Sequence, residues 1–157
     1  MFSPSQKIGL DGEMWVHHQL ELLGYIAKLK PSFFEACCDL VIEGLPVEVK
    51  LSKPSAKWKM LSDGIFQGYP RWQWNVSAVN TADRVLILVA QDNHGANYPF
   101  IMPGVIMARR GNFEINTHPA KYKGILAGYL NNWAVIDFML KKRYQEAGQL
   151  SLETACV

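Results

Sequence analysis

The chain has 157 residues, 49% of them hydrophobic, and a formal net charge of +2 at pH 7. This length and apolar content predict a single domain over residues 1–157, and the small net charge excludes binding of a polyanion through a global electrostatic field. The three cysteines lack C-x-x-C spacing, which argues against a disulfide framework or a structural zinc site and favours a reducing, cytoplasmic location. No apolar run reaches the ~18 residues of a membrane span, so we expect no membrane partner.

The predicted elements begin with a helix over residues 9–23, in which apolar residues recur at helical spacing and which Gly24 ends. Three short strands follow, over residues 25–30, 34–42 and 45–52. A second helix is predicted over residues 57–68 despite Gly64, and residues 84–90 form a strand of valine, leucine and isoleucine that is buried on both faces. This order predicts an α/β core over about residues 8–91 with a mixed central sheet.

An extension over about residues 97–148 is expected beyond this core. One or two strands over residues 98–107 are interrupted by Pro103 and Gly104. Apolar residues spaced three or four apart then lead into a C-terminal helix over residues 133–146, which Gly148 is expected to stop. The cations of residues 141–143 would lie in its last turns, where the helix dipole favours them.

The chemistry of the chain is concentrated in one predicted hairpin. If residues 46–51 form a strand, Glu48 and Lys50 lie on one face and the valines on the other. A tight reversal at Gly44 would place Asp39 beside Glu48. Two carboxylates and an ammonium would then lie together, and such a group can hold a hard divalent cation beside a phosphate.

Other interpretations of these residues stay open. The aspartate and the Glu-x-Lys triplet alone also fit a solvated hairpin with cross-strand pairs, each contributing ~0.2–1 kcal/mol. His17 and His18 lack the spacing of a zinc site and are interpreted as surface or edge residues. No G-x-S-x-G or Walker motif is found, which argues against triad chemistry and against a nucleotide cofactor.

Glu13 on the first helix, Asp39 and the triplet Glu48-Val49-Lys50, in the order helix, three strands, helix, strand, resemble the PD-(D/E)xK nuclease superfamily. The pattern G-L-D-G-E-x-x-V-x-x-x-L-x-x-x-G-Y of residues 9–25 is similar to the opening helix of its resolvase-like branch. Cys38 stands where the family has a proline, a position that carries no chemistry.

The resemblance implies a restriction-endonuclease-like αβββαβ core followed by C-terminal helices. It also implies that Asp39 and Glu48 bind a divalent metal, that Lys50 serves the attacking water, and that Glu13 completes the site. The carbonyl of Val49 is placed to add a ligand for Mg²⁺, with Mn²⁺ expected to substitute. Gln67, on the predicted second helix, is a further catalytic candidate.

The expected function is a divalent-metal-dependent DNA endonuclease of the homing, restriction or junction-resolving type. Cutting both strands of duplex DNA would require a homodimer or a higher homo-oligomer. The candidate DNA-binding cations, which fit solvated loops or aromatic packing as well, are Lys53, Lys57, Lys59, Arg71, Arg109 and Arg110. The alternative is a non-catalytic nucleic-acid-binding or assembly module that keeps the fold and merely pairs Glu48 with Lys50.

Overall fold

The computed structural model describes residues 3–30, 38–77 and 83–155. The two α-helices are α1 (Pro4–Leu22) and α2 (Ala134–Ala155). The strands are β1 (Ala27–Leu29), β2 (Leu40–Ile42), β3 (Leu45–Ser52), β4 (Ser55–Met60), β5 (Phe66–Asn75), β6 (Val85–Gln91), β7 (Asn97–Pro103) and β8 (Asn112–Ile115). The 3-10 helices are η1 (Gly104–Met107), η2 (Pro119–Lys121) and η3 (Ala127–Tyr129).

Helix α1 confirms the predicted first helix but begins earlier, at Pro4. Ser3 caps it through a capping box, in which the Ser3 hydroxyl accepts from the Gln6 N–H and the Gln6 side chain accepts from the Ser3 N–H. The helix ends at Leu22, and Gly24, which follows the C-cap residue Leu23, has a φ of +90°, a left-handed conformation that a glycine adopts without strain. The predicted stop signal is therefore confirmed.

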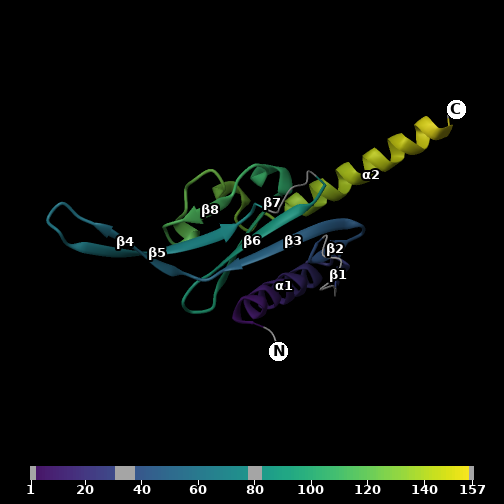
Figure 1. Cartoon of the computed structure of the whole chain (residues 1–157). Coiled ribbons are helices and arrows are strands. Elements are labelled where there is room, and N and C mark those ends of the chain that lie inside the picture. Colours follow the sequence, from purple (N-terminus) through teal and green to yellow (C-terminus); the bar gives the residue numbers. More distant parts are fainter. Residues whose placement is uncertain (1–2, 31–37, 78–82, 156–157) are drawn as a thin grey trace.

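The central sheet has the strand order β1-β2-β3-β6-β7 among the described residues (Figure 1). Strands β3 and β6 are parallel and the other neighbours are antiparallel, so the sheet is mixed as predicted. A two-residue turn joins β2 to β3, and both of its residues have positive φ, +49° at Glu43 and +82° at Gly44. This geometry is that of a tight hairpin turn, and it confirms the predicted reversal.

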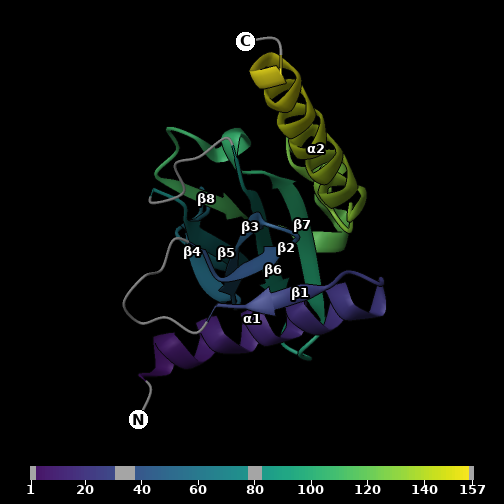
Figure 2. The ribbon, with the colours of Figure 1, turned by 90° about the vertical axis from the view of Figure 1, so that its right-hand side faces the viewer.

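The two faces of the central sheet bury different partners. Helices α1 and α2 lie on one face, where they pack against alternate residues of β3 and β6 such as Val49 and Ile87 (Figure 2). The opposite face receives Trp72 and Trp74 of β5, which pack with Leu88 and its neighbours. Residues 85–90 are all buried, as expected for a strand covered on both sides.

The prediction of a helix over residues 57–68 is wrong, because this segment forms the antiparallel hairpin of β4 and β5. Lys57 pairs with Tyr69 and Met60 with Phe66, and the turn between the strands contains Gly64 at φ +78°. Polar and apolar residues alternate along β4, and this period of two is the period of a strand. The hairpin thus takes the place of the second helix in the expected core order.

The C-terminal third agrees with the prediction only in part. The expected interruption at Pro103 and Gly104 is confirmed, because β7 ends at Pro103, but residues 104–107 form η1 in place of a further strand, and β8 is not among the predicted elements. The helical spacing after Tyr122 corresponds to the 3-10 turn η3. Helix α2 continues through Gly148 to Ala155, so Gly148 does not stop it and residues 141–143 do not lie in its last turns. No helix in the described part of the chain is long and apolar enough to cross a membrane.

Candidate functional site

Asp39 lies immediately before β2 and is held against β3. Its backbone N–H donates to the Val47 carbonyl at 3.0 Å, which extends the β2–β3 pairing by one residue. Its carboxylate oxygen Oδ2 accepts a hydrogen bond from the Val49 N–H at 2.7 Å. The Asp39 carboxylate therefore lies beside β3 at the residue between Glu48 and Lys50.

Glu48 and Lys50 alternate with the buried valines of β3 and share the other face of the strand. The Lys50 ammonium lies 3.5 Å from Glu48 Oε1, and both side chains are largely buried, with 27% of the Lys50 and 20% of the Glu48 side-chain area exposed. The structure thus brings Asp39 beside the stretch of β3 that carries Glu48 and Lys50.

Arg84 is a member of this site that the sequence did not reveal. Its guanidinium lies 3.8 Å from Glu48 Oε2, and its side chain is only 15% exposed. The position follows from the parallel pairing of Val47 with Val85, which places the residue before β6 alongside β3. The sequence shows Arg84 as a cation at the start of an apolar strand. It does not show which strand pairs with that strand, and so it does not identify Glu48 as the partner of Arg84.

Burial is the largest cause of the pKa shifts of the Asp39 and Glu48 carboxyls. Burial raises the pKa of Asp39 above its ordinary value, while the hydrogen bond from Val49 and the charges of Lys50 and Arg84 oppose this shift. Burial, followed by the charge of Asp39, raises the pKa of Glu48, again against Lys50 and Arg84. The two cations therefore do not fully compensate the acidic pair.

Glu13 belongs to the same electrostatic site and reaches it from helix α1. This helix approaches β3 so closely at Gly12 that a Cβ there would lie 2.9 Å from the Leu51 Cβ. Burial, and then the charges of Asp39 and Glu48, raise the pKa of Glu13 to about 7. A group with this pKa exchanges a proton near neutral pH.

The donor set fits a hard cation that retains water molecules. No group of three or more His, Cys, Asp or Glu side chains in the described ranges is arranged to hold a metal ion, so Glu13 does not form a three-carboxylate set with Asp39 and Glu48. The N–H and C=O of one strand residue point to the same side of the strand, so the Val49 carbonyl lies on the side of Asp39. Two carboxylates and one carbonyl suit Mg²⁺, which usually keeps several waters.

Gln67 was predicted to lie on a helix near this site, and this prediction is wrong. The residue lies on β5, opposite Lys59. The base of β5 contacts β3 where the Gln73 N–H donates to the Ser52 hydroxyl at 3.0 Å. Six residues of extended strand separate Gln67 from Gln73, a distance of roughly 20 Å. The reason for assigning Gln67 a catalytic role is therefore removed.

The candidate DNA-binding cations fall into two places. Lys53 joins β3 to β4, and Lys57, Lys59 and Arg71 lie on the hairpin of β4 and β5. Lys57 also pairs with Glu114 of β8 at 2.7 Å. The remaining two, Arg109 and Arg110, are exposed after η1. Three of the first four thus lie on the hairpin, and Lys53 lies at its base.

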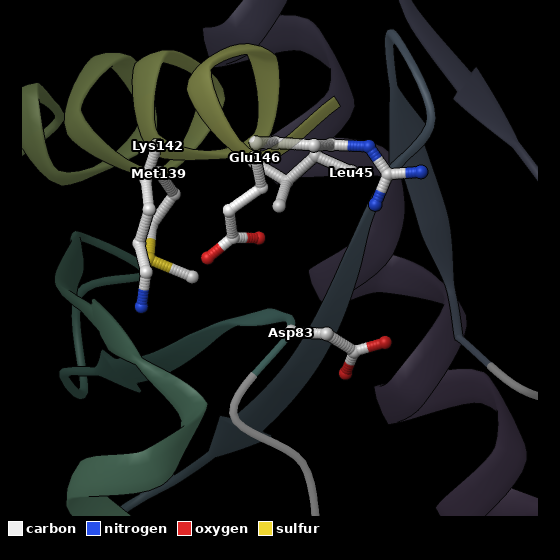
Figure 3. Close-up of a pocket in the computed structure, with 6 residues that line it drawn as sticks. Leu45, Asp83, Met139, Lys142 and Glu146 are labelled. Carbon is white, nitrogen blue, oxygen red and sulfur yellow. The ribbon is translucent and has the colours of Figure 1, made fainter. Parts of the chain in front are cut away.

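A separate pocket of about 190 Å³ lies between α2 and the end of the central sheet (Figure 3). Leu45 and Asp83 line it from the sheet side, and Met139, Lys142, Arg143 and Glu146 line it from α2. Its two acidic and two basic side chains balance in charge. It contains none of the predicted site residues.

No protein-family model and no curated protein matches this chain. Among solved structures, the fold is similar to that of the bacterial homing endonuclease I-Ssp6803I, with a TM-score of 0.57 and 17% sequence identity. The similarity covers 94% of this chain and 99% of that chain. This similarity shows that the chain shares its mixed α/β fold, with a mixed central sheet and helices at both ends, with an endonuclease.

Proposed function

We propose that this protein is a divalent-metal-dependent DNA endonuclease of the PD-(D/E)xK type. The observation that carries this proposal is the position of Asp39, whose carboxylate lies against β3 at Val49, between Glu48 and Lys50. An aspartate and a Glu-x-Lys triplet in this arrangement are the elements of the motif. The fold shared with a homing endonuclease supports the same conclusion and favours the homing type.

Each residue of the site has a proposed role. Asp39, Glu48 and the Val49 carbonyl would hold Mg²⁺ or Mn²⁺, which supplies a Lewis acid and an activated water when bound. The Lys50 ammonium would orient the attacking water or offset charge on the phosphate. Arg84 limits the repulsion between the carboxylates and the DNA, and Glu13 accepts a proton near neutral pH or binds through a retained water.

Duplex DNA is the proposed substrate, and a homodimer or a higher homo-oligomer is the proposed active form. One such site cuts one strand, so a symmetric pair of sites is needed for a double-strand break. Lys53 and the cations of the hairpin, together with Arg109 and Arg110, are proposed to contact DNA phosphates.

The test is plasmid cleavage by the wild type and by site variants with Mg²⁺ and with Mn²⁺. We expect Asp39→Asn, Glu48→Gln and Lys50→Ala each to lower the cleavage rate by about a hundredfold or more. The first two variants each remove the charge of a proposed metal ligand, and the third removes the cation proposed to act on the water or the phosphate. Asparagine keeps an oxygen for the Val49 N–H, so the Asp39 variant tests charge more than folding. The Arg84→Lys variant should cleave faster than the Arg84→Ala variant, because lysine keeps the positive charge near Glu48.

Matched controls are Asp11→Asn and Lys28→Ala, because both residues are exposed and lie outside the site. These variants should cleave like the wild type. A wild-type protein that leaves linear, supercoiled and four-way-junction DNA intact with both metals contradicts the proposal.

The second candidate is a non-catalytic nucleic-acid-binding module. The ion pairs of Glu48 with Lys50 and with Arg84 favour it, because they give the Glu48 carboxylate two cationic protein partners. DNA binding by the wild type without cleavage under any of these conditions would identify this case.

A further inference from the structure

The hairpin of β4 and β5, here called the β4–β5 ribbon (residues 55–71), extends away from the body of the protein (Figure 1). Beyond its base it has no neighbouring strand among the described residues, and most of its side chains are exposed. Trp58 and Phe66 show this clearly, with 66% and 62% of their areas exposed. A two-stranded ribbon gains little stability by itself, so a projecting one of this composition points to a binding function.

The ribbon has two chemically different faces. Residues directly opposite in an antiparallel pair share a face. The pairs Ser55–Arg71, Lys57–Tyr69 and Lys59–Gln67 make one face polar, and the alternate pairs Ala56–Pro70, Trp58–Gly68 and Met60–Phe66 make the other apolar. The apolar face is continuous with the core, because Trp72 and Trp74 follow Pro70 at the same alternation and are buried. The polar face is therefore the one presented to a charged ligand.

The charge of the polar face is positive. It carries Lys57, Lys59 and Arg71, whereas the one acidic residue of the ribbon, Asp63, lies in its turn. Glu114, on the neighbouring β8, pairs with Lys57, and this hydrogen bond lowers the pKa of Glu114. Arg71 Nε donates to the Ser55 hydroxyl at 3.4 Å, which leaves its other guanidinium donors for a ligand.

The ribbon is connected directly to the candidate catalytic strand. Strand β3 passes into β4 through Lys53 and Pro54, and the Gln73 N–H at the base of β5 donates to Ser52 at the end of β3. A ligand held along the ribbon is therefore held by an element fixed to the strand that carries Glu48 and Lys50. This connection suits an element that positions the substrate for cleavage.

We propose that the polar face of the β4–β5 ribbon enters the major groove of duplex DNA and determines where the enzyme cuts. The inference rests on the proposed function. The major groove admits a two-stranded ribbon, whereas the minor groove is about half as wide. The amide of Gln67 and the guanidinium of Arg71 are groups that pair with adenine and guanine edges, and Lys59 is placed to contact phosphate or guanine.

The test measures binding of a fluorescein-labelled, mixed-sequence duplex by fluorescence anisotropy, with Ca²⁺ in place of Mg²⁺. We expect Lys59→Ala and Arg71→Ala each to weaken binding by about tenfold, and the log–log salt slope to fall by about 1 for each phosphate that the variant no longer neutralises. Lys28→Ala, which removes an exposed cation on β1, is the matched control and should bind like the wild type. Methyl green, a major-groove ligand, should displace the protein, whereas netropsin, a minor-groove ligand, should not.

The inference is overturned if both ribbon variants bind like Lys28→Ala, or if netropsin displaces the protein and methyl green does not. Circular dichroism of each variant checks that the exposed substitutions leave the fold intact. The binding assay does not depend on cleavage. Binding in the major groove without any cleavage would contradict the proposed endonuclease function but support the role of the ribbon. Cleavage by a protein whose ribbon variants bind DNA like the wild type would support the endonuclease function but contradict the role of the ribbon.

Discussion

Glu13 shows how neighbouring residues determine the charge of a single side chain in this protein. Its pKa is raised from 4.5 to about 7 by burial and by the charges of Asp39 and Glu48. The ionised form is therefore disfavoured in the folded protein relative to the unfolded chain. The contribution of Glu13 to stability is complete below pH 4.5 and is lost as the pH rises through 7.

Glu13→Gln should therefore raise the free energy of unfolding at pH 8 and not at pH 4.5. We expect a gain of about 1–2 kcal/mol at pH 8, less than the full pKa shift implies, because solvent screens this half-buried position. Urea unfolding at both pH values measures it. Glu21→Gln, an exposed position on the same helix, should show no such pH-dependent gain. Equal gains at both pH values would show that charge is not the cause.

The contact of α1 with β3 is the structural element that keeps Glu13 near the site. Gly12 allows this contact, because a Cβ at position 12 would lie 2.9 Å from the Leu51 Cβ and 3.7 Å from Val49 Cγ1. Gly9, on the same helix, has no atom within 4 Å of the corresponding position. Both glycines therefore have the backbone conformation of a helix, but only Gly12 is packed against another element.

Gly12→Ala and Gly9→Ala should therefore have opposite effects on stability. We expect Gly9→Ala to raise the free energy of unfolding by about 0.5–1 kcal/mol, since alanine is the better helix former. Gly12→Ala should lower it by about 1–2 kcal/mol net, because overpacking against Leu51 outweighs that gain. Denaturant unfolding of the two variants measures both. A Gly12→Ala protein as stable as Gly9→Ala would show that α1 shifts without cost.

The whole molecule is nearly neutral in net charge, yet its fold brings Glu13 of α1 close enough to Asp39 and to Glu48 of β3 for their charges to interact. The raised pKa values of Glu13, Asp39 and Glu48 indicate that burial, and for Glu13 and Glu48 also the charge of neighbouring carboxylates, costs stability when these groups are ionised. A cation that binds there should relieve the repulsion, and protons should compete with it.

Divalent cation should therefore raise the melting temperature more at pH 8 than at pH 5.5. At a Mg²⁺ concentration ten times the dissociation constant, we expect the free energy of unfolding to rise by about 1.4 kcal/mol, which raises the melting temperature by roughly 3–6 °C. Differential scanning fluorimetry against NaCl of equal ionic strength measures the specific part. Asp39→Asn should abolish the Mg²⁺ increment while it raises the melting temperature without metal. If Mg²⁺ raises the melting temperature of the Asp39→Asn variant as much as that of the wild type, the cation binds elsewhere.

The sequence alone determined the elements whose signals are local. The tight turn at Gly44, the alternation of Glu48 and Lys50 with valines, and the apolar run of residues 85–90 depend on residues close in the chain, and the structure contains each of them. The same local reasoning led to a wrong prediction for residues 57–68, because their apolar residues fit the spacing of a helix as well as the alternation of a strand. The pairing of β4 with β5 decided that case.

Only the tertiary structure decided the composition and the charge of the site. Arg84 reaches Glu48 because β6 pairs in parallel with β3, which brings together two residues that are far apart in the chain. The pKa of Glu13 depends on burial and on charges from two other strands. Helical and strand periods are properties of neighbouring residues, whereas electrostatic energies depend on distance and burial in space, which exist only after the chain has folded.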